Sequence, residues 1–184
     1  RKVKTTGPIF EQADEIIAGY LGGKYAQNVP LAFSISLSFE QSYGGIEGDS
    51  ASVAEVLAII SSLSGLEIDQ GLAVTGSMRQ NGLVQPVGGL WEKIESGWYQ
   101  TCKNKGLTGS QGVMVPRVNM DNLILDEELI GAIGEGRFHI YAVSHIDEAI
   151  FLAFGREPDE VHALAQAKVE SFYKKLKAKS GEKE

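Results

Sequence analysis

The segment Glu47-Gly48-Asp49-Ser50-Ala51-Ser52 places a serine at the end of a glycine-marked turn, where a helix is predicted to begin. The apolar residues that follow recur at helical spacing on one face: Val53, Val56, Leu57, Ile60 and Leu63. This pattern predicts a helix over residues 49–64 that ends at Gly65. Backbone N–H groups at a helix N-terminus can stabilise a developing oxyanion. Taken alone, however, the segment is better explained as a helix cap formed by Asp49 or Ser50.

A second glycine-marked segment opens another predicted helix, Pro86-Val87-Gly88-Gly89-Leu90-Trp91-Glu92-Lys93. This helix is predicted to run to Lys103, because apolar residues recur at intervals of four: Leu90, Ile94, Trp98 and Cys102. A cation near a helix N-terminus is unfavourable, which favours the neutral amine that a general base requires. Most lysines at such positions are simply solvated. By itself this segment therefore carries no functional assignment.

The remaining segments predict a mixture of helices and strands. Strict alternation of apolar residues predicts a half-buried strand over residues 31–39, and Asn81-Gly82 predicts a hairpin turn between two strands within residues 71–87. Further strands are expected at 112–116 and 138–143, and further helices at 10–26, 126–133, 146–154 and 159–178. Because helices and strands do not alternate regularly, the sequence favours the α+β class.

Three motifs in order, EGDSAS at 47–52, AVTGS at 73–77 and PVGGLWEK at 86–93, together resemble the proteolytic domain of Lon proteases, especially the B-type branch. The resemblance extends from about Gly7 to Gly155. Three ordered motifs at consistent spacing are far more specific than either segment alone. The resemblance implies a Lon protease proteolytic domain-like fold, also described as ribosomal protein S5 domain 2-like.

The resemblance also implies roles for individual residues. Ser50 matches the family's nucleophile and Lys93 its general base. Thr75 matches a threonine whose hydroxyl lies near the catalytic lysine, which implies a positioning role, although a local hydrogen bond at a strand end explains a threonine there as well. Asp49 either orients the two residues or caps the helix, and Gly48 belongs to the turn that supports the oxyanion or positions the serine.

For the whole protein, the resemblance implies a serine endopeptidase that degrades unfolded polypeptides. Such proteins form homo-hexameric rings and carry an upstream ATPase module, where ATP and Mg²⁺ bind. We expect residues 1–156 to be an N-terminally truncated proteolytic domain and residues 157–184 a C-terminal helical extension. The location implied is the prokaryotic cytoplasm, with membrane anchoring of a full-length protein left open. The alternative is a catalytically silent Lon-like domain that serves as a ring-forming scaffold.

Composition excludes several other classes of protein. The formal net charge is −7, and residues 1–156 carry 18 acidic against 11 basic side chains, so nucleic acid is not expected as a partner. Cys102 is the only cysteine, which excludes an internal disulfide and zinc sites built from several cysteines. The glycines before Lys24 lack the spacing of a phosphate-binding loop, and Tyr25 stands where the loop needs Ser or Thr. We therefore expect no cofactor or metal site in this chain.

Overall fold

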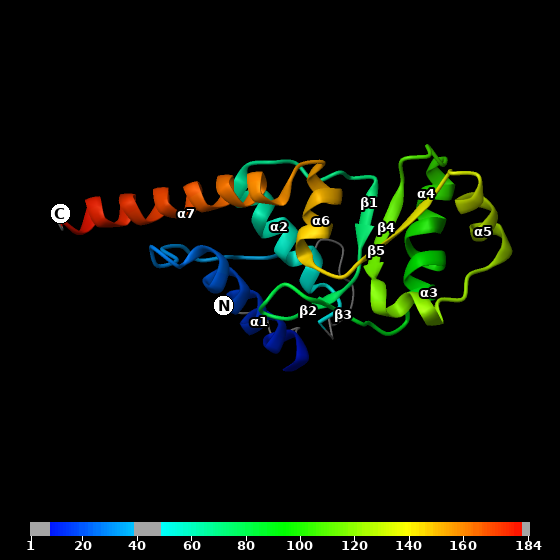
Figure 1. Ribbon diagram of the computed structural model, residues 1–184, viewed down its shortest axis with the longest axis horizontal. Helices are drawn as coiled ribbons and strands as arrows, with labels where there is room; N and C mark the ends of the chain where they lie inside the picture. The colour runs from blue at the N-terminus through cyan, green and yellow to red at the C-terminus, as the bar shows by residue number, and fades with distance from the viewer. Residues whose placement is uncertain (1–7, 39–48, 182–184) are drawn as a thin grey trace.

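The computed structural model describes residues 8–38 and 49–181 (Figure 1). Its elements, in chain order, are α1 (Pro8–Tyr25), α2 (Ser52–Ser64), β1 (Leu72–Val74), β2 (Ser77–Met78), β3 (Val84–Gln85), α3 (Leu90–Glu92), the π-helix η1 (Lys93–Tyr99), α4 (Gln100–Lys105), β4 (Gly112–Pro116), the 3₁₀-helix η2 (Arg117–Asn122), α5 (Glu127–Gly134), β5 (His139–Val143), α6 (Ile146–Phe154) and α7 (Pro158–Ser180). Helices and a small sheet are thus mixed, which is consistent with the predicted α+β class.

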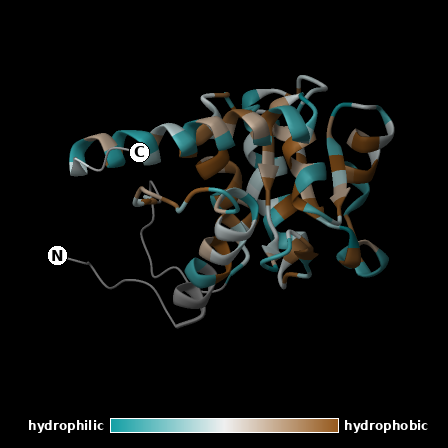
Figure 2. Ribbon diagram, turned by 60° about the vertical axis from the view of Figure 1, so that its left-hand side comes forward, coloured by the Kyte–Doolittle hydropathy of each residue, from teal (hydrophilic) through white to brown (hydrophobic). Residues whose placement is uncertain are grey.

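A parallel three-stranded sheet in the order β1-β4-β5 separates two groups of helices (Figure 1). The helices α1, α2, α6 and α7 share one apolar cluster, and the helical segment 90–105 shares a second cluster with α5. The central strand β4 serves both, because successive side chains of a strand point to opposite faces. Met114 packs into the first cluster, whereas Val113 and Val115 pack into the second. Figure 2 shows the apolar segments gathered in the middle of the body, at the sheet and the inner sides of the helices.

The first part of helix α7 packs into the first apolar cluster. Val161, Ala165 and Val169 are fully buried there, and α7 packs mainly against α2. Its C-terminal part extends away from the sheet, so that the end of the helix lies at one extreme of the molecule (Figure 1). The domain boundary placed at residue 156 stays a prediction.

The strand predicted over residues 31–39 is wrong for the part that the structure describes. Residues 31–38 are assigned to no strand, and Phe39 lies outside the described residues. The residues Ile35 and Leu37 are 42% and 40% exposed. Alternating hydrophobicity indicates which side chains would share a face, but a strand also needs a neighbouring backbone to pair with. Within the described residues this segment has none.

The hairpin predicted around Asn81-Gly82 is confirmed, but it is shorter than expected. The strands β2 and β3 pair in an antiparallel manner over two residues each, through Ser77 with Gln85 and Met78 with Val84. The residues before them form β1, which joins the parallel sheet beside β4 instead. The first predicted strand of the hairpin thus forms two separate strands, β1 and β2, with Thr75 and Gly76 between them.

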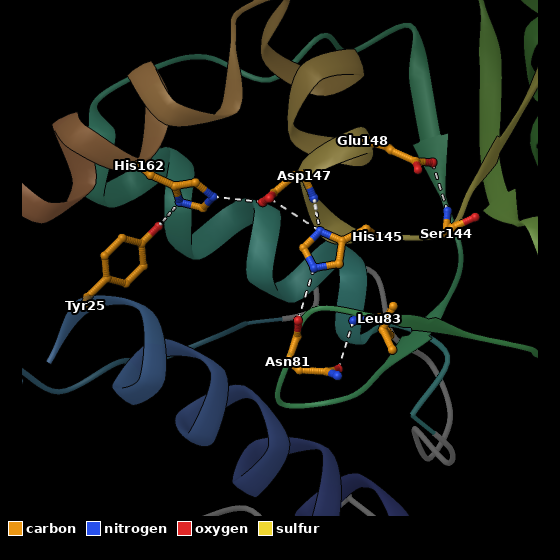
Figure 3. Close-up of polar contacts among 8 residues, drawn as sticks. All are labelled: Tyr25, Asn81, Leu83, Ser144, His145, Asp147, Glu148 and His162. Atoms are coloured by element: carbon orange, nitrogen blue, oxygen red, sulfur yellow. Dashed lines mark hydrogen bonds and ion pairs between the residues drawn. The ribbon is translucent and has the colours of Figure 1, made fainter. Parts of the chain in front are cut away.

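A series of polar contacts ties this hairpin to the first group of helices (Figure 3). Asn81 O lies 3.1 Å from His145 Nε2, and His145 Nδ1 accepts from the Asp147 amide at 3.2 Å to cap α6. His162 on α7 bridges two of these elements: its Nε2 lies 2.9 Å from Asp147 Oδ1 and its Nδ1 lies 2.7 Å from the Tyr25 hydroxyl. Burial lowers the pKa of His162, opposed by the hydrogen bond to Asp147.

Candidate active site

Ser50 lies in the turn that leads into α2, and its backbone is held by the segment that joins β1 to β2. Ser50 O accepts from Gly76 N at 2.8 Å and from the Thr75 hydroxyl at 3.3 Å. In return, Val53 N donates to Gly76 O at 3.1 Å. A Cβ at position 76 would lie 3.0 Å from Val53 Cγ2, so any side chain there would require Val53 to shift by a few tenths of an ångström. Position 50 is therefore fixed by residues about 25 positions later in the chain.

Lys93 is the first residue of η1 and lies in the first turn of the helical segment that begins after Gly89. Gly89 has a φ of 61°, a left-handed conformation that lets the chain turn sharply into the helix. From this turn the Lys93 side chain reaches Ser50, with its Nζ 3.0 Å from Ser50 Oγ. The predicted pair, 43 residues apart in the sequence, is thus within hydrogen-bond distance.

Thr75 completes a group of three polar side chains. Its Oγ1 lies 3.5 Å from Lys93 Nζ, a long contact, and the threonine itself is buried. Its backbone N–H donates to Met114 O at 3.1 Å, which anchors the residue to the central strand β4. The Thr75 hydroxyl therefore stands between the backbone that carries Ser50 and the amine of Lys93. A neutral amine in this position can accept the proton of the Ser50 hydroxyl.

Asp49 does not cap α2, so that part of the sequence-based interpretation is wrong. The N-cap position is Ala51, without a side-chain cap, and the Asp49 carboxylate instead accepts a hydrogen bond from the Ser77 hydroxyl on β2. The Asp49 backbone oxygen accepts from Ser52 Oγ at 2.6 Å. Sequence reasoning missed Ser77, although it is the last residue of the AVTGS motif and buried. Gly48, the remaining predicted residue, lies outside the described residues.

The start of α2 offers backbone donors beside Ser50. Within residues 8–38 and 49–181, the amides of Ser50 and Ala51 donate to no acceptor, whereas the next amide, that of Ser52, bonds to Asp49 O at 3.0 Å. Donors of this kind at the positive end of a helix dipole can bind a developing negative charge. In the part of the chain that the structure describes, no group of three or more His, Cys, Asp or Glu side chains is placed to hold a metal ion.

No helix among the described residues combines the length and the apolar character needed to span a membrane.

Comparison with known proteins assigns the chain to a family. Residues 42–156 match the family model described as the Lon protease (S16) C-terminal proteolytic domain. A Lon protease homolog of Escherichia coli (strain K12) is 43% identical over 150 residues, which cover 82% of this chain and 25% of that protein. An archaeal Lon protease from Archaeoglobus fulgidus is 33% identical over 151 residues, 81% of this chain and 22% of that protein. The chain thus spans about a quarter of the length of these relatives. With most of its residues matched, this chain belongs to the family of Lon protease C-terminal proteolytic domains.

Proposed function

We propose that this chain is the proteolytic part of an ATP-dependent serine protease, in which Ser50 is the nucleophile and Lys93 the general base. The observation that carries the proposal is the 3.0 Å distance between Lys93 Nζ and Ser50 Oγ. A serine hydroxyl is a weak nucleophile unless an adjacent base removes its proton. Among the contacts recorded for Ser50 Oγ in the described residues, Lys93 is the only side chain that can act as this base.

The two residues can complete peptide hydrolysis between them. Ser50 Oγ attacks the carbonyl carbon of the scissile bond while its proton passes to Lys93 Nζ, and the carbonyl oxygen becomes an oxyanion. The oxyanion collapses, the C–N bond breaks, and the ammonium of Lys93 returns the proton to the leaving amine. Water then attacks the acyl ester and gives a proton to Lys93. The ester C–O bond breaks and Ser50 recovers its proton, so that both residues end as they began.

Local structure supports these roles. Lys93 lies in the first turn of a helical segment, and from there its Nζ reaches Ser50 Oγ. The amides of Ser50 and Ala51 supply the donors for the oxyanion in this proposal. Thr75 acts as a positioning residue, because its hydroxyl contacts both the Ser50 backbone and the Lys93 amine. Asp49 and Ser77 fix the turn that carries the nucleophile.

For the whole protein, we propose the organisation that the family membership suggests. Unfolded polypeptides are the substrates, six chains form a ring, and an upstream module binds ATP and Mg²⁺. The ribosomal protein S5 domain 2-like architecture and the extension after residue 156 belong to this proposal as well. The net charge of −7 is consistent with a protein that does not bind nucleic acid.

The test is covalent labelling with a fluorophosphonate, followed by peptide mass mapping. We expect the label on Ser50, and we expect Lys93→Ala to abolish labelling because the hydroxyl then lacks its base. Ser62→Ala, which changes an exposed serine on the same helix α2, is the matched control and should label normally. A label on another serine would overturn the assignment. A folded protein that takes no label but assembles into rings would favour the scaffold alternative.

A further inference from the structure

The loop of residues 86–89 leads into the helical segment that carries Lys93. It joins β3 to α3, and the pairing of β3 with β2 ends at Gln85, two residues before Val87. Beyond that point the helical segment 90–105 begins without a side-chain cap at Gly89 and passes into a π-helical turn from Lys93. The backbone groups of an uncapped helix start are not satisfied by the helix itself. Something outside the helix must therefore hold the loop.

The Asn119 side chain holds this loop by bonding to both the backbone N–H and the backbone C=O of Val87. Its Oδ1 accepts from Val87 N at 3.0 Å, and its Nδ2 donates to Val87 O at 3.0 Å. These two bonds replace the pairing that the next residue of a β-ladder would provide. Because one partner is a donor and the other an acceptor, only one orientation of the Asn119 carboxamide satisfies both. A shape-conserving change to aspartate cannot do so, since a carboxylate only accepts.

Asn119 is itself attached to the strand that positions Thr75. It lies in η2, which begins directly after β4, and β4 receives the Thr75 amide at Met114 O. The chain segment of β4 and η2 thus supports two parts of the site: Thr75, which contacts the Lys93 amine, through Met114 O, and the loop before Lys93 through Asn119. The two supports share one frame, so the distance from Lys93 to Ser50 depends on both.

We propose that Asn119 is a positioning residue of the active site, which clamps the Val87 peptide so that Lys93 Nζ stays within reach of Ser50 Oγ. This inference rests on the proposed function of Ser50 and Lys93. Asn119 touches neither of them and acts only through the backbone of residues 87–93. Its loss should therefore lower the rate of the chemical step and leave peptide binding largely unchanged.

The experiment compares Asn119→Ala and Asn119→Asp with Asn122→Ala, which removes an exposed asparagine from the same helix η2. With an unstructured fluorogenic peptide, both Asn119 variants should lose about tenfold to 100-fold in kcat with KM changed less than about twofold, because an ångström-scale misplacement can cost 100-fold. Fluorophosphonate labelling of Ser50 should slow by a similar factor. Hydrogen exchange at the Val87 amide should accelerate in Asn119→Ala, and Asn122→Ala should match the wild type in every measurement.

The outcomes separate the two proposals. Faster exchange at Val87 with unchanged kcat and labelling would overturn the positioning role while leaving Ser50 and Lys93 in place. Unchanged exchange at Val87 would show that the clamp does not form. If Asn119→Ala does not fold, as judged by circular dichroism, kcat, KM and labelling of Asn119→Asp decide the question, because its carboxylate can accept from Val87 N but cannot donate to Val87 O. Activity or labelling that survives in Ser50→Ala would refute the proposed function itself, whatever the Asn119 variants do.

Discussion

Lys93 Nζ lies 3.0 Å from Ser50 Oγ, although 43 residues separate the two in the chain. Neither residue reaches this position by its own local structure. Ser50 is held by the backbone of Gly76, and Lys93 extends from a helix start that follows a left-handed glycine. The contact is therefore a property of the tertiary fold.

The first prediction concerns how these two residues act together. Ser50→Ala and Lys93→Ala should each abolish peptide cleavage, and the double variant should be no worse than either single one, because residues that act as a unit are non-additive. Lys93→Arg should be equally inactive, since a guanidinium stays protonated and cannot serve as a base. Initial rates on an unstructured peptide, with circular dichroism as the folding control, provide the measurement. Near-normal cleavage by Ser50→Ala would remove the serine from the mechanism.

Much of the fold could be predicted because local signals agree with tertiary packing. The helix expected over 146–154 and the strand expected over 112–116 match α6 and β4 residue for residue, and Gly65 ends α2 with a φ of 74°. In each case an apolar pattern of the right period is bounded by a residue that stops the element. The strand expected over residues 31–39 is not formed at residues 31–38, because alternation of apolar residues does not reveal whether a neighbouring strand is there to pair with.

The π-helix η1 is the second feature that the sequence did not predict. Apolar residues at intervals of four, from Leu90 to Cys102, were interpreted as a regular helix. In an α-helix each such interval turns the next side chain by about 40° away from the last, because four residues exceed one turn. The wider turn over Lys93–Tyr99 takes up this drift and lets Leu90, Ile94 and Cys102 all be buried. Nothing in the spacing alone distinguishes the two solutions.

For the site, the motifs located residues but not their contacts. The resemblance singled out Ser50, Thr75 and Lys93, and the fold brings these three together. It assigned no role to Asn119, whose side chain reaches the Val87 backbone 32 residues away. Contacts of that kind depend on how strands and helices are arranged in space, which no local pattern encodes. The roles of all these residues stay predictions.

The second prediction separates the hydroxyl of Thr75 from its shape. Thr75→Val keeps the volume of the side chain but removes the contacts to Ser50 O and Lys93 Nζ. A neutral hydrogen bond contributes about 1 kcal/mol net, so kcat should fall by roughly fivefold to tenfold. Thr75→Ser, which keeps the hydroxyl, should restore most of the rate. Equal kcat in Thr75→Val and the wild type would reduce this threonine to a local strand-end role.

The third prediction concerns His162, whose pKa is lowered chiefly by burial. The charged groups that act on this pKa are Asp147 on α6, Lys24 on α1 and Asp159 on α7. Below the ordinary histidine pKa of about 6.5, His162 binds a proton in the unfolded chain, whereas in the folded protein it does so only at a lower pH. The stability linked to His162 is therefore present above that pH and is lost as the pH falls through the lowered pKa.

Urea unfolding at pH 5 and pH 7.5 measures this effect. His162→Asn should flatten the dependence of the free energy of unfolding on pH, at the cost of lower stability at pH 7.5. The matched control is His139→Asn, because His139 is half-buried on β5 and outside the contacts drawn in Figure 3. An unchanged slope in His162→Asn would show that this histidine is not linked to folding.

The last prediction concerns Glu55, a buried residue of α2 with an effect of the opposite sign. Neither oxygen of its carboxyl has a hydrogen-bond partner within the described residues, and only 4% of the residue is exposed. Burial, and next the charge of Asp14, raises the pKa of Glu55 to about 7. Between pH 4.5 and 7 the folded protein therefore binds more protons than the unfolded chain, and the free energy of unfolding falls as the pH rises.

Glu55→Gln removes the charge without changing the shape of the side chain, so it should stabilise the protein at pH 8 and leave it nearly unchanged at pH 4.5. Because a protein relaxes around a buried charge, we expect a gain of about 1–2 kcal/mol at pH 8 rather than the full equivalent of the pKa shift. Urea unfolding of the variant and the wild type across this pH range is the measurement. Glu67→Gln, at an exposed glutamate soon after α2, controls for the loss of one negative charge and should show no such gain. Equal stability of Glu55→Gln and the wild type at pH 8 would mean that Glu55 gains a partner when it ionises.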